Sequence, residues 1–260
     1  MSDHASENPS EFEGRVALIT GAGAGIGSTT AKRLAAGGAT VVLTDKHAGR
    51  LEAAVASVKQ LSPAIAPVGH LLDIEKRDDF DRVFADVEAS LGPIQIFVWN
   101  AALNIQQPIL DYDPELFDRI AYANINNCWY ASAAVAKQMK RAGGGSIVMV
   151  GSIAPELGAT EREPPYGIAK AASRGLMYGL ARACGPDNIR CNEVIMGLVE
   201  GTRFVDARPD RAAHFAAETP MGRNATTEDI AEAIAFLASD RSAFISGDVM
   251  KVTGALLGGL

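Results

Sequence analysis

Short apolar runs rich in β-branched residues alternate with longer segments of helical period along the whole of this 260-residue sequence. Runs of this length and composition indicate buried strands, and apolar spacings of three and four residues indicate helices. The pattern predicts strands at Val16–Thr20, Thr40–Thr44, Ile65–Leu71, Ile94–Trp99, Ser146–Val150, Ile189–Ile195 and Asp248–Val252. Between them it predicts helices at Gly25–Gly37, Ala48–Leu61, Lys76–Leu91, Pro114–Ala142, Pro165–Ala183 and Thr227–Ala238.

Regular alternation of strand and helix implies a parallel sheet with helices on both faces. We therefore expect an α/β fold, a single-domain Rossmann-type doubly wound parallel sheet of about seven strands. Short connections and the lack of a Pro/Ser-rich linker place this domain at 13–260, after a flexible tail at 1–12. Segment 199–226 interrupts the alternation and is rich in Arg, Pro and small residues, so we interpret it as a substrate lid.

Composition narrows the class of protein. With 48% hydrophobic and 21% charged residues the chain is typical of a soluble globular protein. Twenty-four basic residues against 31 acidic ones give a net charge of −7 without a basic cluster, which argues against a nucleic-acid partner. The start of the chain does not resemble a signal peptide, and no apolar run has the length needed to cross a bilayer. We expect a cytoplasmic protein with no membrane partner.

Cysteine and histidine positions give no sign of a metal centre. The three cysteines are sparse and odd in number, which suits a reduced intracellular protein. They are Cys128, Cys184 and Cys191. The histidines also lack a metal-ligand spacing, and they are His4, His47, His70 and His214. We expect no bound metal.

A glycine-rich segment, Thr20-Gly21-Ala22-Gly23-Ala24-Gly25-Ile26-Gly27, follows the first predicted strand and opens the first predicted helix. Glycines let the backbone turn sharply and approach a pyrophosphate, and the helix N-terminus offers N–H groups to the anion. A glycine-rich turn alone is common, but its place between strand and helix predicts a dinucleotide site. The expected contacts are Gly21, Gly23, Ala24, Gly25, Ile26 and Gly27.

Asp45 ends the second predicted strand, eighteen residues after Gly27. A carboxylate at this distance can accept hydrogen bonds from the adenosine ribose and would repel the 2′-phosphate of NADP. NAD is therefore favoured over NADP. Lys46 and His47 follow directly and could soften this discrimination, and a solvated strand-end aspartate is the alternative interpretation.

Further motifs follow in chain order. Leu72-Asp73-Ile74 comes after the third predicted strand and Asn100-Ala101 after the fourth, and Asn124 lies in a predicted helix. Ser152 comes shortly after the fifth strand, and Tyr166-Gly167-Ile168-Ala169-Lys170 opens the next helix. From about Gly14 to Gly254 this series resembles the classical short-chain dehydrogenase/reductase family, including its TGxxxGxG loop. A YxxxK motif alone is common by chance, whereas the ordered set is specific.

The resemblance implies site residues. The catalytic ones would be Ser152, Tyr166, Lys170 and Asn124. Beyond the glycine loop and Asp45, the implied cofactor contacts are Asp73, Ile74, Asn100, Ala101, Tyr166, Lys170, Gly197, Val199 and Thr202. Thr202 lies one residue after the position of the family's carboxamide-binding threonine, where this chain has Gly201.

The chemistry of these residue types suits hydride transfer. Tyr166 and Lys170 are four apart on a predicted helix, so they project from one face. A phenol is a poor base at neutral pH, but a nearby ammonium and a positive nicotinamide both favour the phenolate. By resemblance, Tyr166 removes the hydroxyl proton, Ser152 polarises the same oxygen, Lys170 also binds the nicotinamide ribose and Asn124 holds a water. Taken singly, each could be an ordinary structural residue.

Several positions depart from the family pattern without removing a catalytic group. They are Trp99, Ala102, Gly151, Glu193, Met196 and Thr253. Glu193 is an acid where a small residue is common, and the sequence gives no account of it. Trp99 and Ala102, near the end of the fourth strand, and Met196, after the sixth, lie where the resemblance places the contacts to the nicotinamide end of the cofactor.

The substrate pocket is expected to have mostly apolar walls. They would come from Leu103, Asn104, Ile105, Ala154, Pro155, Glu156 and Leu157 and from the lid with Leu198, Val199, Phe204 and Phe215. Such walls suit a cyclic or moderately hydrophobic secondary alcohol. The arginines of the lid could be solvated or bind a carboxylate, and they are Arg203, Arg208 and Arg211. The particular substrate stays open.

These features predict an oxidoreductase that transfers a hydride between NAD(H) and a secondary alcohol or ketone. One alternative is an NADPH-dependent 3-oxoacyl-thioester reductase of fatty-acid synthesis, against which Asp45 counts. Another is a non-catalytic nucleotide-binding protein, which would be expected to lack Tyr166, Lys170 or Ser152. The resemblance also implies a homo-oligomer, a tetramer in preference to a dimer, with contacts at Pro114–Ala142, Pro165–Ala183 and Gly254–Leu260.

Overall fold

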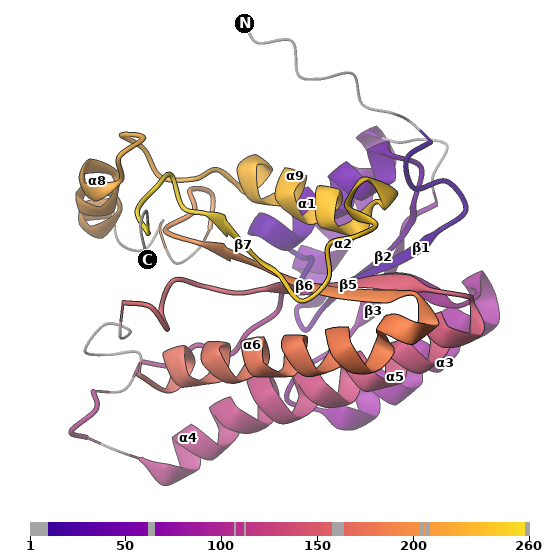
Figure 1. The fold of residues 1–260 in the computed structure, drawn as a ribbon, viewed down its shortest axis with the longest axis horizontal. Coiled ribbons are helices and arrows are strands. Elements are labelled where there is room, and N and C mark those ends of the chain that lie inside the picture. The colour runs from indigo at the N-terminus through magenta and orange to yellow at the C-terminus, as the bar shows by residue number, and fades with distance from the viewer. Residues whose placement is uncertain are drawn as a thin grey trace, which may run out of the picture.

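A computed structural model describes residues 10–61, 66–106, 108–111, 113–157, 164–202, 205 and 209–257 of the chain. Their strands form one seven-stranded sheet with the order β3-β2-β1-β4-β5-β6-β7, and every pairing is parallel (Figure 1). The strands are β1 (Val16–Thr20), β2 (Thr40–Asp45), β3 (Val68–Leu71), β4 (Ile94–Trp99), β5 (Gly145–Val150), β6 (Ile189–Met196) and β7 (Val249–Val252). The predicted doubly wound α/β fold is confirmed.

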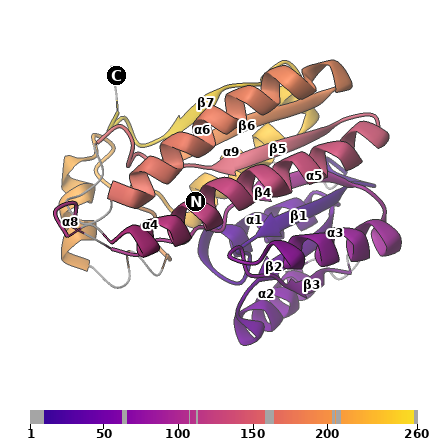
Figure 2. The ribbon, with the colours of Figure 1, turned by 90° about the horizontal axis from the view of Figure 1, so that it is seen from below.

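Helices cover both faces of the sheet. One layer contains α1 (Gly25–Ala36), α2 (Ala48–Leu61) and α9 (Thr227–Ala238) (Figure 1). The other contains α3 (Arg77–Leu91), α4 (Pro114–Ala121), α5 (Asn127–Arg141) and α6 (Pro164–Cys184), which Figure 2 shows in front of the sheet. Each layer encloses its own apolar core, and the central strands are buried on both sides, which explains their continuous apolar runs.

The predicted helix Pro114–Ala142 is interrupted. Between α4 and α5 the chain forms one π-helical turn, Tyr122–Asn126, which contains Asn124. Turns of this type insert an extra residue into a helix and are frequent at functional sites. Helical periodicity does not reveal such an insertion, so the sequence predicted a single helix. Ile65, expected to begin the third strand, lies outside the described residues.

Segment 199–226, expected to be irregular, contains helix α8 (Pro209–Glu218) and a bridge between Val199 and Ala225. Phe215 of α8 packs against a small apolar cluster of Ile153, Ile195 and Leu257. This cluster joins the predicted lid to the sheet and to the C-terminal segment. Arg203, Phe204 and Arg208 lie outside the described residues, as do His4 and 258–260.

Trp99 has a structural explanation. Its side chain is 2% exposed and stacks on Phe80 of α3, with a centroid distance of 5.9 Å. Phe97, two residues earlier on the same face of β4, and Phe84 complete this aromatic cluster. An apolar ring at position 99 therefore fills the core beneath α3.

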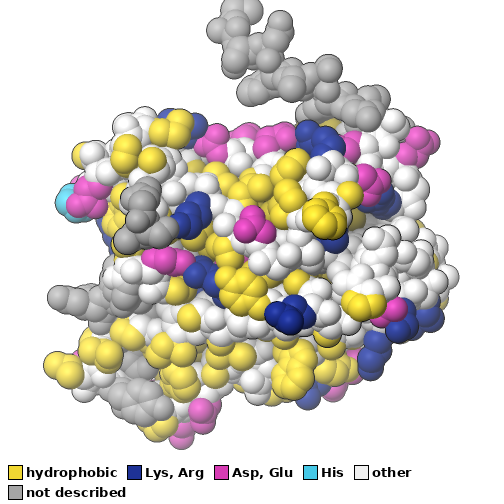
Figure 3. Space-filling view, viewed as in Figure 1, with side chains coloured by type: hydrophobic (Ala, Val, Ile, Leu, Met, Phe, Trp, Pro, Cys, Tyr) yellow, Lys and Arg dark blue, Asp and Glu magenta, His cyan; other side chains and the backbone are white. Residues whose placement is uncertain are grey.

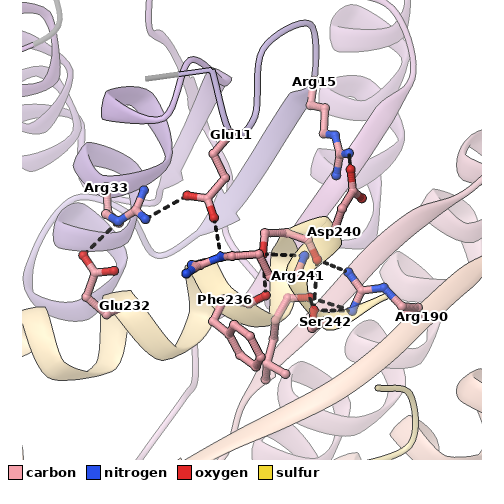
Figure 4. A network of polar contacts seen from close by, with 11 residues as sticks. Glu11, Arg15, Arg33, Arg190, Glu232, Phe236, Asp240, Arg241 and Ser242 are labelled. Carbon is pink, nitrogen blue, oxygen red and sulfur yellow. Dashed lines mark hydrogen bonds and ion pairs between the residues drawn. The ribbon is translucent and has the colours of Figure 1, made fainter. Parts of the chain in front are cut away.

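The N-terminal segment is held by a network of ions (Figure 4). Glu11 accepts a hydrogen bond from Arg33 of α1 at 2.8 Å and pairs with Arg241 at 2.9 Å, and Arg33 also pairs with Glu232 of α9. Only 9% of the side chain is exposed in both Glu11 and Arg33. Phe12 is fully buried, so the packed part of the chain begins before residue 13.

None of the helices in the described ranges is long and apolar enough to cross a membrane.

The buried position of Glu11 predicts a loss of stability when its carboxylate is removed. We expect Glu11→Ala to lower the free energy of unfolding by about 2 kcal/mol, because Arg33 would keep only the more exposed Glu232 as a partner and Arg241 would lose its pair. The control is Lys140→Gln, which removes a pair with Asp187 whose side chains are 65% and 32% exposed. Urea unfolding measures both, and equal small losses in the two variants would contradict the assignment.

Candidate active site

The carboxyl ends of the parallel strands meet at one edge of the sheet, where their loops enclose a cavity of about 640 Å³. Gly21 follows β1, Asp45 ends β2, Asn100 follows β4 and Ser152 lies two residues after β5, and all four line this cavity. The sheet order reverses between β1 and β4, since β1 is followed on one side by β2 and on the other by β4. Ligands of open α/β sheets bind at such a point.

The glycine turn is held by hydrogen bonds between β1 and β4. The Nδ2 of Asn100 donates to the carbonyls of Thr20 at 2.9 Å and Gly21 at 3.1 Å. The hydroxyl of Thr20 accepts from the backbone N–H of Asn100 and of Ala101. Gly21 has a φ of +66°, and a Cβ at Gly27 would lie 2.5 Å from the Gly21 carbonyl oxygen. Both positions therefore require glycine.

No side chain caps the N-terminus of α1, which begins at Gly25. Its first N–H groups and the positive end of its dipole are directed toward the loop, as phosphate binding requires. Ala24, Gly25 and Ile26 line the cavity here. The cradle thus fits a dinucleotide pyrophosphate.

Asp45 lies against the glycine loop. Its Oδ2 accepts from the backbone N–H of Gly23 at 3.2 Å, and its Oδ1 accepts from that of His47 at 2.9 Å. A Cβ at Gly23 would come within 2.6 Å of Oδ2, so glycine is needed for this close approach. Lys46 pairs with Glu75 at 3.8 Å, and Glu75 also lines the cavity. Asp45 and Glu75 therefore border this end of the cavity together with Lys46, His47 and Arg50.

Ser152 and Tyr166 both line the cavity. Lys170 lies behind the tyrosine, with its Nζ 5.5 Å from the centroid of the Tyr166 ring. Only 4% of Lys170 is exposed, and its Nζ donates to the Val150 carbonyl at 2.6 Å. The Ser152 hydroxyl accepts from the backbone N–H of Ala154. A hydroxyl and a phenol thus line the same cavity, with a buried ammonium behind the phenol ring.

Asn124 is buried in the π-helical turn and contacts the segment after β4. Its Oδ1 accepts from the N–H of Leu103 at 2.8 Å, and its Nδ2 donates to the Leu103 carbonyl at 2.7 Å. The side chain therefore fastens one wall of the cavity without lining it. Its expected role in holding a water stays a prediction.

The structure gathers most of the predicted site residues around the cavity. Those that line it are Gly21, Ala24, Gly25, Ile26, Asp45, Ile74, Asn100, Ala101, Ser152, Tyr166, Gly197, Val199 and Thr202. Five do not: Gly23, Gly27, Asp73, Asn124 and Lys170. Gly23 and Gly27 shape the loop from behind. Asp73 accepts from the N–H of Glu75 at 3.1 Å, which gives it a turn-forming contact rather than a place in the cavity wall.

Sequence reasoning missed several residues of the site. Among the cavity residues it did not single out are Arg50, Glu75, Ile153 and Val205. It also left Glu193 unexplained. That side chain is fully buried on β6 and bonded to Arg174 of α6, and burial raises the pKa of its carboxyl group while Arg174 opposes the rise. No spacing in the sequence could have paired these two residues.

Two further observations limit the chemistry. Burial raises the pKa of the Cys128 thiol to about 12, so this cysteine stays protonated and unreactive. In the part of the chain that the structure describes, no group of three His, Cys, Asp or Glu side chains could hold a metal ion.

Comparison with known proteins identifies the family. The model of the family described as "Enoyl-(Acyl carrier protein) reductase" matches residues 21–256. The chain is 34% identical over 250 residues to L-rhamnose 1-dehydrogenase (NAD(P)(+)) of Sphingomonas sp. (strain SKA58), covering 94% of this chain and 97% of the relative. It is 31% identical to the 3-oxoacyl-[acyl-carrier-protein] reductase of Escherichia coli (strain K12), covering 94% and 98%.

A solved structure agrees with these relatives. The crystal structure of a putative short-chain alcohol dehydrogenase from Sinorhizobium meliloti 1021 is similar with a TM-score of 0.89 at 28% identity, covering 97% of this chain and all of that one. The chain therefore belongs to the classical short-chain dehydrogenase/reductase family of oxidoreductases.

Proposed function

We propose that this protein is an NAD-dependent dehydrogenase that transfers a hydride between NAD(H) and a secondary alcohol or ketone. The observation that carries the proposal is that Ser152 and Tyr166 line the same cavity, with the buried ammonium of Lys170 behind the phenol ring. The glycine cradle of the same cavity supports a dinucleotide beside them. We further propose that the protein acts in the cytoplasm.

The choice of NAD rests on Asp45. Its carboxylate borders the cavity close to the glycine loop, where it can accept from ribose hydroxyls and would repel an added phosphate. Lys46 is paired with Glu75, so it is drawn toward a second acid rather than toward Asp45. The discrimination expected from the sequence is thereby supported.

The bound nucleotide supplies the carbon that accepts or returns the hydride. Tyr166 accepts the hydroxyl proton of the alcohol as the carbonyl forms, and in reduction it donates the proton back. Ser152 donates a hydrogen bond to the same oxygen and fixes its position. Lys170 stabilises the phenolate electrostatically from behind the ring, and being buried, its charge is weakly screened. In our proposal Lys170 also binds the nicotinamide ribose, and Asn124 serves the proton relay.

The substrate end of the cavity is mostly apolar. Its described walls include Leu103, Ile153, Leu157, Leu198 and Phe215, with Arg211 as a charged group on α8. This supports the proposed class of cyclic or moderately hydrophobic secondary alcohols.

The second candidate, an NADPH-dependent 3-oxoacyl-thioester reductase, is favoured by the similarity to the Escherichia coli enzyme. Asp45 and Glu75 at the nucleotide end count against it. A nucleotide-binding protein without catalysis is a weaker candidate, because Ser152 and Tyr166 face the cavity together.

The catalytic assignment predicts the effect of removing one hydroxyl. We expect Tyr166→Phe to lower kcat for alcohol oxidation by about 10²- to 10⁴-fold, the usual contribution of a general acid or base. NAD affinity should change much less than kcat, since the ring and its packing are kept and at most one hydrogen bond to the cofactor is lost. The control is Tyr178→Phe, a half-exposed tyrosine of the same helix that does not line the cavity. Absorbance at 340 nm measures turnover, and undiminished turnover in Tyr166→Phe would refute the assignment.

The role of Asp45 predicts a change of cofactor preference. We expect Asp45→Ala to raise the Kd of NAD about tenfold, because hydrogen bonds to a charged acceptor are lost, and to lower that of NADP. Asp86→Ala, an exposed change of the same charge on α3, is the matched control. Isothermal titration with both nucleotides measures the effect. Tighter NADP than NAD binding by the unaltered protein would favour the reductase candidate.

We also propose a homo-oligomer, with a tetramer preferred over a dimer. Large apolar side chains are exposed on the helices expected at contacts, namely Trp129 at 64%, Ile168 at 52% and Tyr178 at 46%. On another side, apolar side chains gather across the face of α9 and β7 (Figure 3). Exposed patches of this kind mark contacts between proteins.

The exposed apolar side chains of α5 and α6 predict that a charge placed among them weakens the assembly. We expect Trp129→Lys to give a smaller molecular mass by light scattering than the unaltered chain, because a charge would replace apolar contact area. A monomeric mass for the unaltered chain would contradict the assembly proposal.

A further inference from the structure

A buried network of ions lies directly behind the segment that carries the proposed catalytic serine. Arg174 of α6 donates from Nε to Glu193 of β6 and from Nη1 to Glu156, each at 2.5 Å. Glu193 is fully buried, and the side chains of Arg174 and Glu156 are 19% and 20% exposed. One guanidinium therefore joins the sheet to the segment after β5.

The fold makes room for this network at one position. A Cβ at Gly151 would lie 2.6 Å from the Cδ of Glu193, closer than atoms can approach. Gly151 and Glu193, two departures from the family pattern that seemed unrelated in the sequence, therefore belong together. The missing side chain of the first leaves space for the carboxylate of the second.

The charges in this region balance. Glu156 and Glu193 are opposed by Arg174 and by Lys170, which interacts electrostatically with Glu193. Burying ions costs free energy that their mutual attraction recovers only when the geometry is good. Three polar atoms are buried without a hydrogen-bond partner, namely Glu156 Oε2, Arg174 Nη2 and Glu193 Oε1. A network with this cost is poorly explained by stability alone.

The segment Ser152–Leu157 has two sides. Ser152, Ile153, Ala154 and Leu157 line the cavity, whereas Glu156 does not and instead bonds to Arg174. On the sheet side, the N–H of Ile153 donates to the Met196 carbonyl at 3.2 Å. The ion pair and this bond are thus two ties that fix the segment relative to β6.

We propose that Arg174, anchored on β6 by Glu193, is a positioning residue that holds segment Ser152–Leu157 in place through Glu156, and with it the serine hydroxyl and one wall of the substrate cavity. The catalytic part of this inference rests on the proposed function. An error of about 1 Å in the position of a reacting group can cost on the order of 10²-fold in rate. Because the Arg174–Glu156 pair does not contact the glycine loop, we expect its loss to change binding of the alcohol and to leave binding of the nucleotide unchanged.

The test is Glu156→Gln, which keeps the shape of the side chain, removes the charge that Arg174 holds, and leaves the Arg174–Glu193 pair in place. Glu88→Gln is the matched control, since Glu88 also pairs with an arginine at 2.5 Å but lies on α3. Hydrogen exchange with NAD present, followed by mass spectrometry, compares the peptide covering 151–157. We expect exchange about tenfold faster in Glu156→Gln, as for the loss of one charge-assisted hydrogen bond, and no change in Glu88→Gln.

Kinetics give a second readout that general destabilisation would not produce. We expect the KM for the alcohol to rise about tenfold in Glu156→Gln while the KM for NAD stays constant. Glu193→Gln, which weakens the anchor of Arg174 on β6 without touching the cavity lining, should show the same split. Unchanged exchange in 151–157, or an unchanged KM for the alcohol, would overturn the proposal. If the unaltered protein oxidises no alcohol, the proposed function fails, and the exchange experiment still decides whether the tie exists.

Discussion

The hydrogen-bonded junction between the ends of β1 and β4 is the constraint on which the site depends. The side chain of Asn100, directly after β4, donates to the carbonyls of Thr20 and Gly21. In return, the Thr20 hydroxyl accepts from the two backbone N–H groups that follow β4. This junction lies where the strand order reverses, so the loops on either side diverge and leave a crevice. The glycine turn, the start of α1 and the wall at Ala101 all take their positions from it.

Away from that junction, the walls of the cavity are held in place by side chains that do not line the cavity. Asn124 fastens Leu103 from the π-helical turn, and Lys170 is held against Val150 by a short hydrogen bond. Arg174 holds the segment after β5 by its hydrogen bond to Glu156. Because these supporting groups are buried or half-buried, they hold the cavity-lining atoms in one arrangement, as the proposed placement of an alcohol beside a nucleotide requires.

The sequence was sufficient to predict the parallel sheet and the succession of strands and helices along the chain, because these follow from local periodicity. The glycines of the first loop were predictable because each has a clear steric reason. Tyr166 and Lys170 were predictable as a pair because they lie four positions apart on one helix, and such positions share a face. Contacts between distant segments were not predictable. The pairing of Gly151 with Glu193 and the clamp of Asn124 on Leu103 depend on how β6 and the π-helical turn pack, and a periodic pattern carries no information about either.

A crystal structure of the protein with NAD bound would test the central claim most directly. The account predicts the pyrophosphate over Gly21–Gly27, the adenosine ribose at Asp45 and the nicotinamide beside Ser152 and Tyr166. A nucleotide bound away from the junction of β1 and β4, or with its nicotinamide directed away from Tyr166, would contradict it.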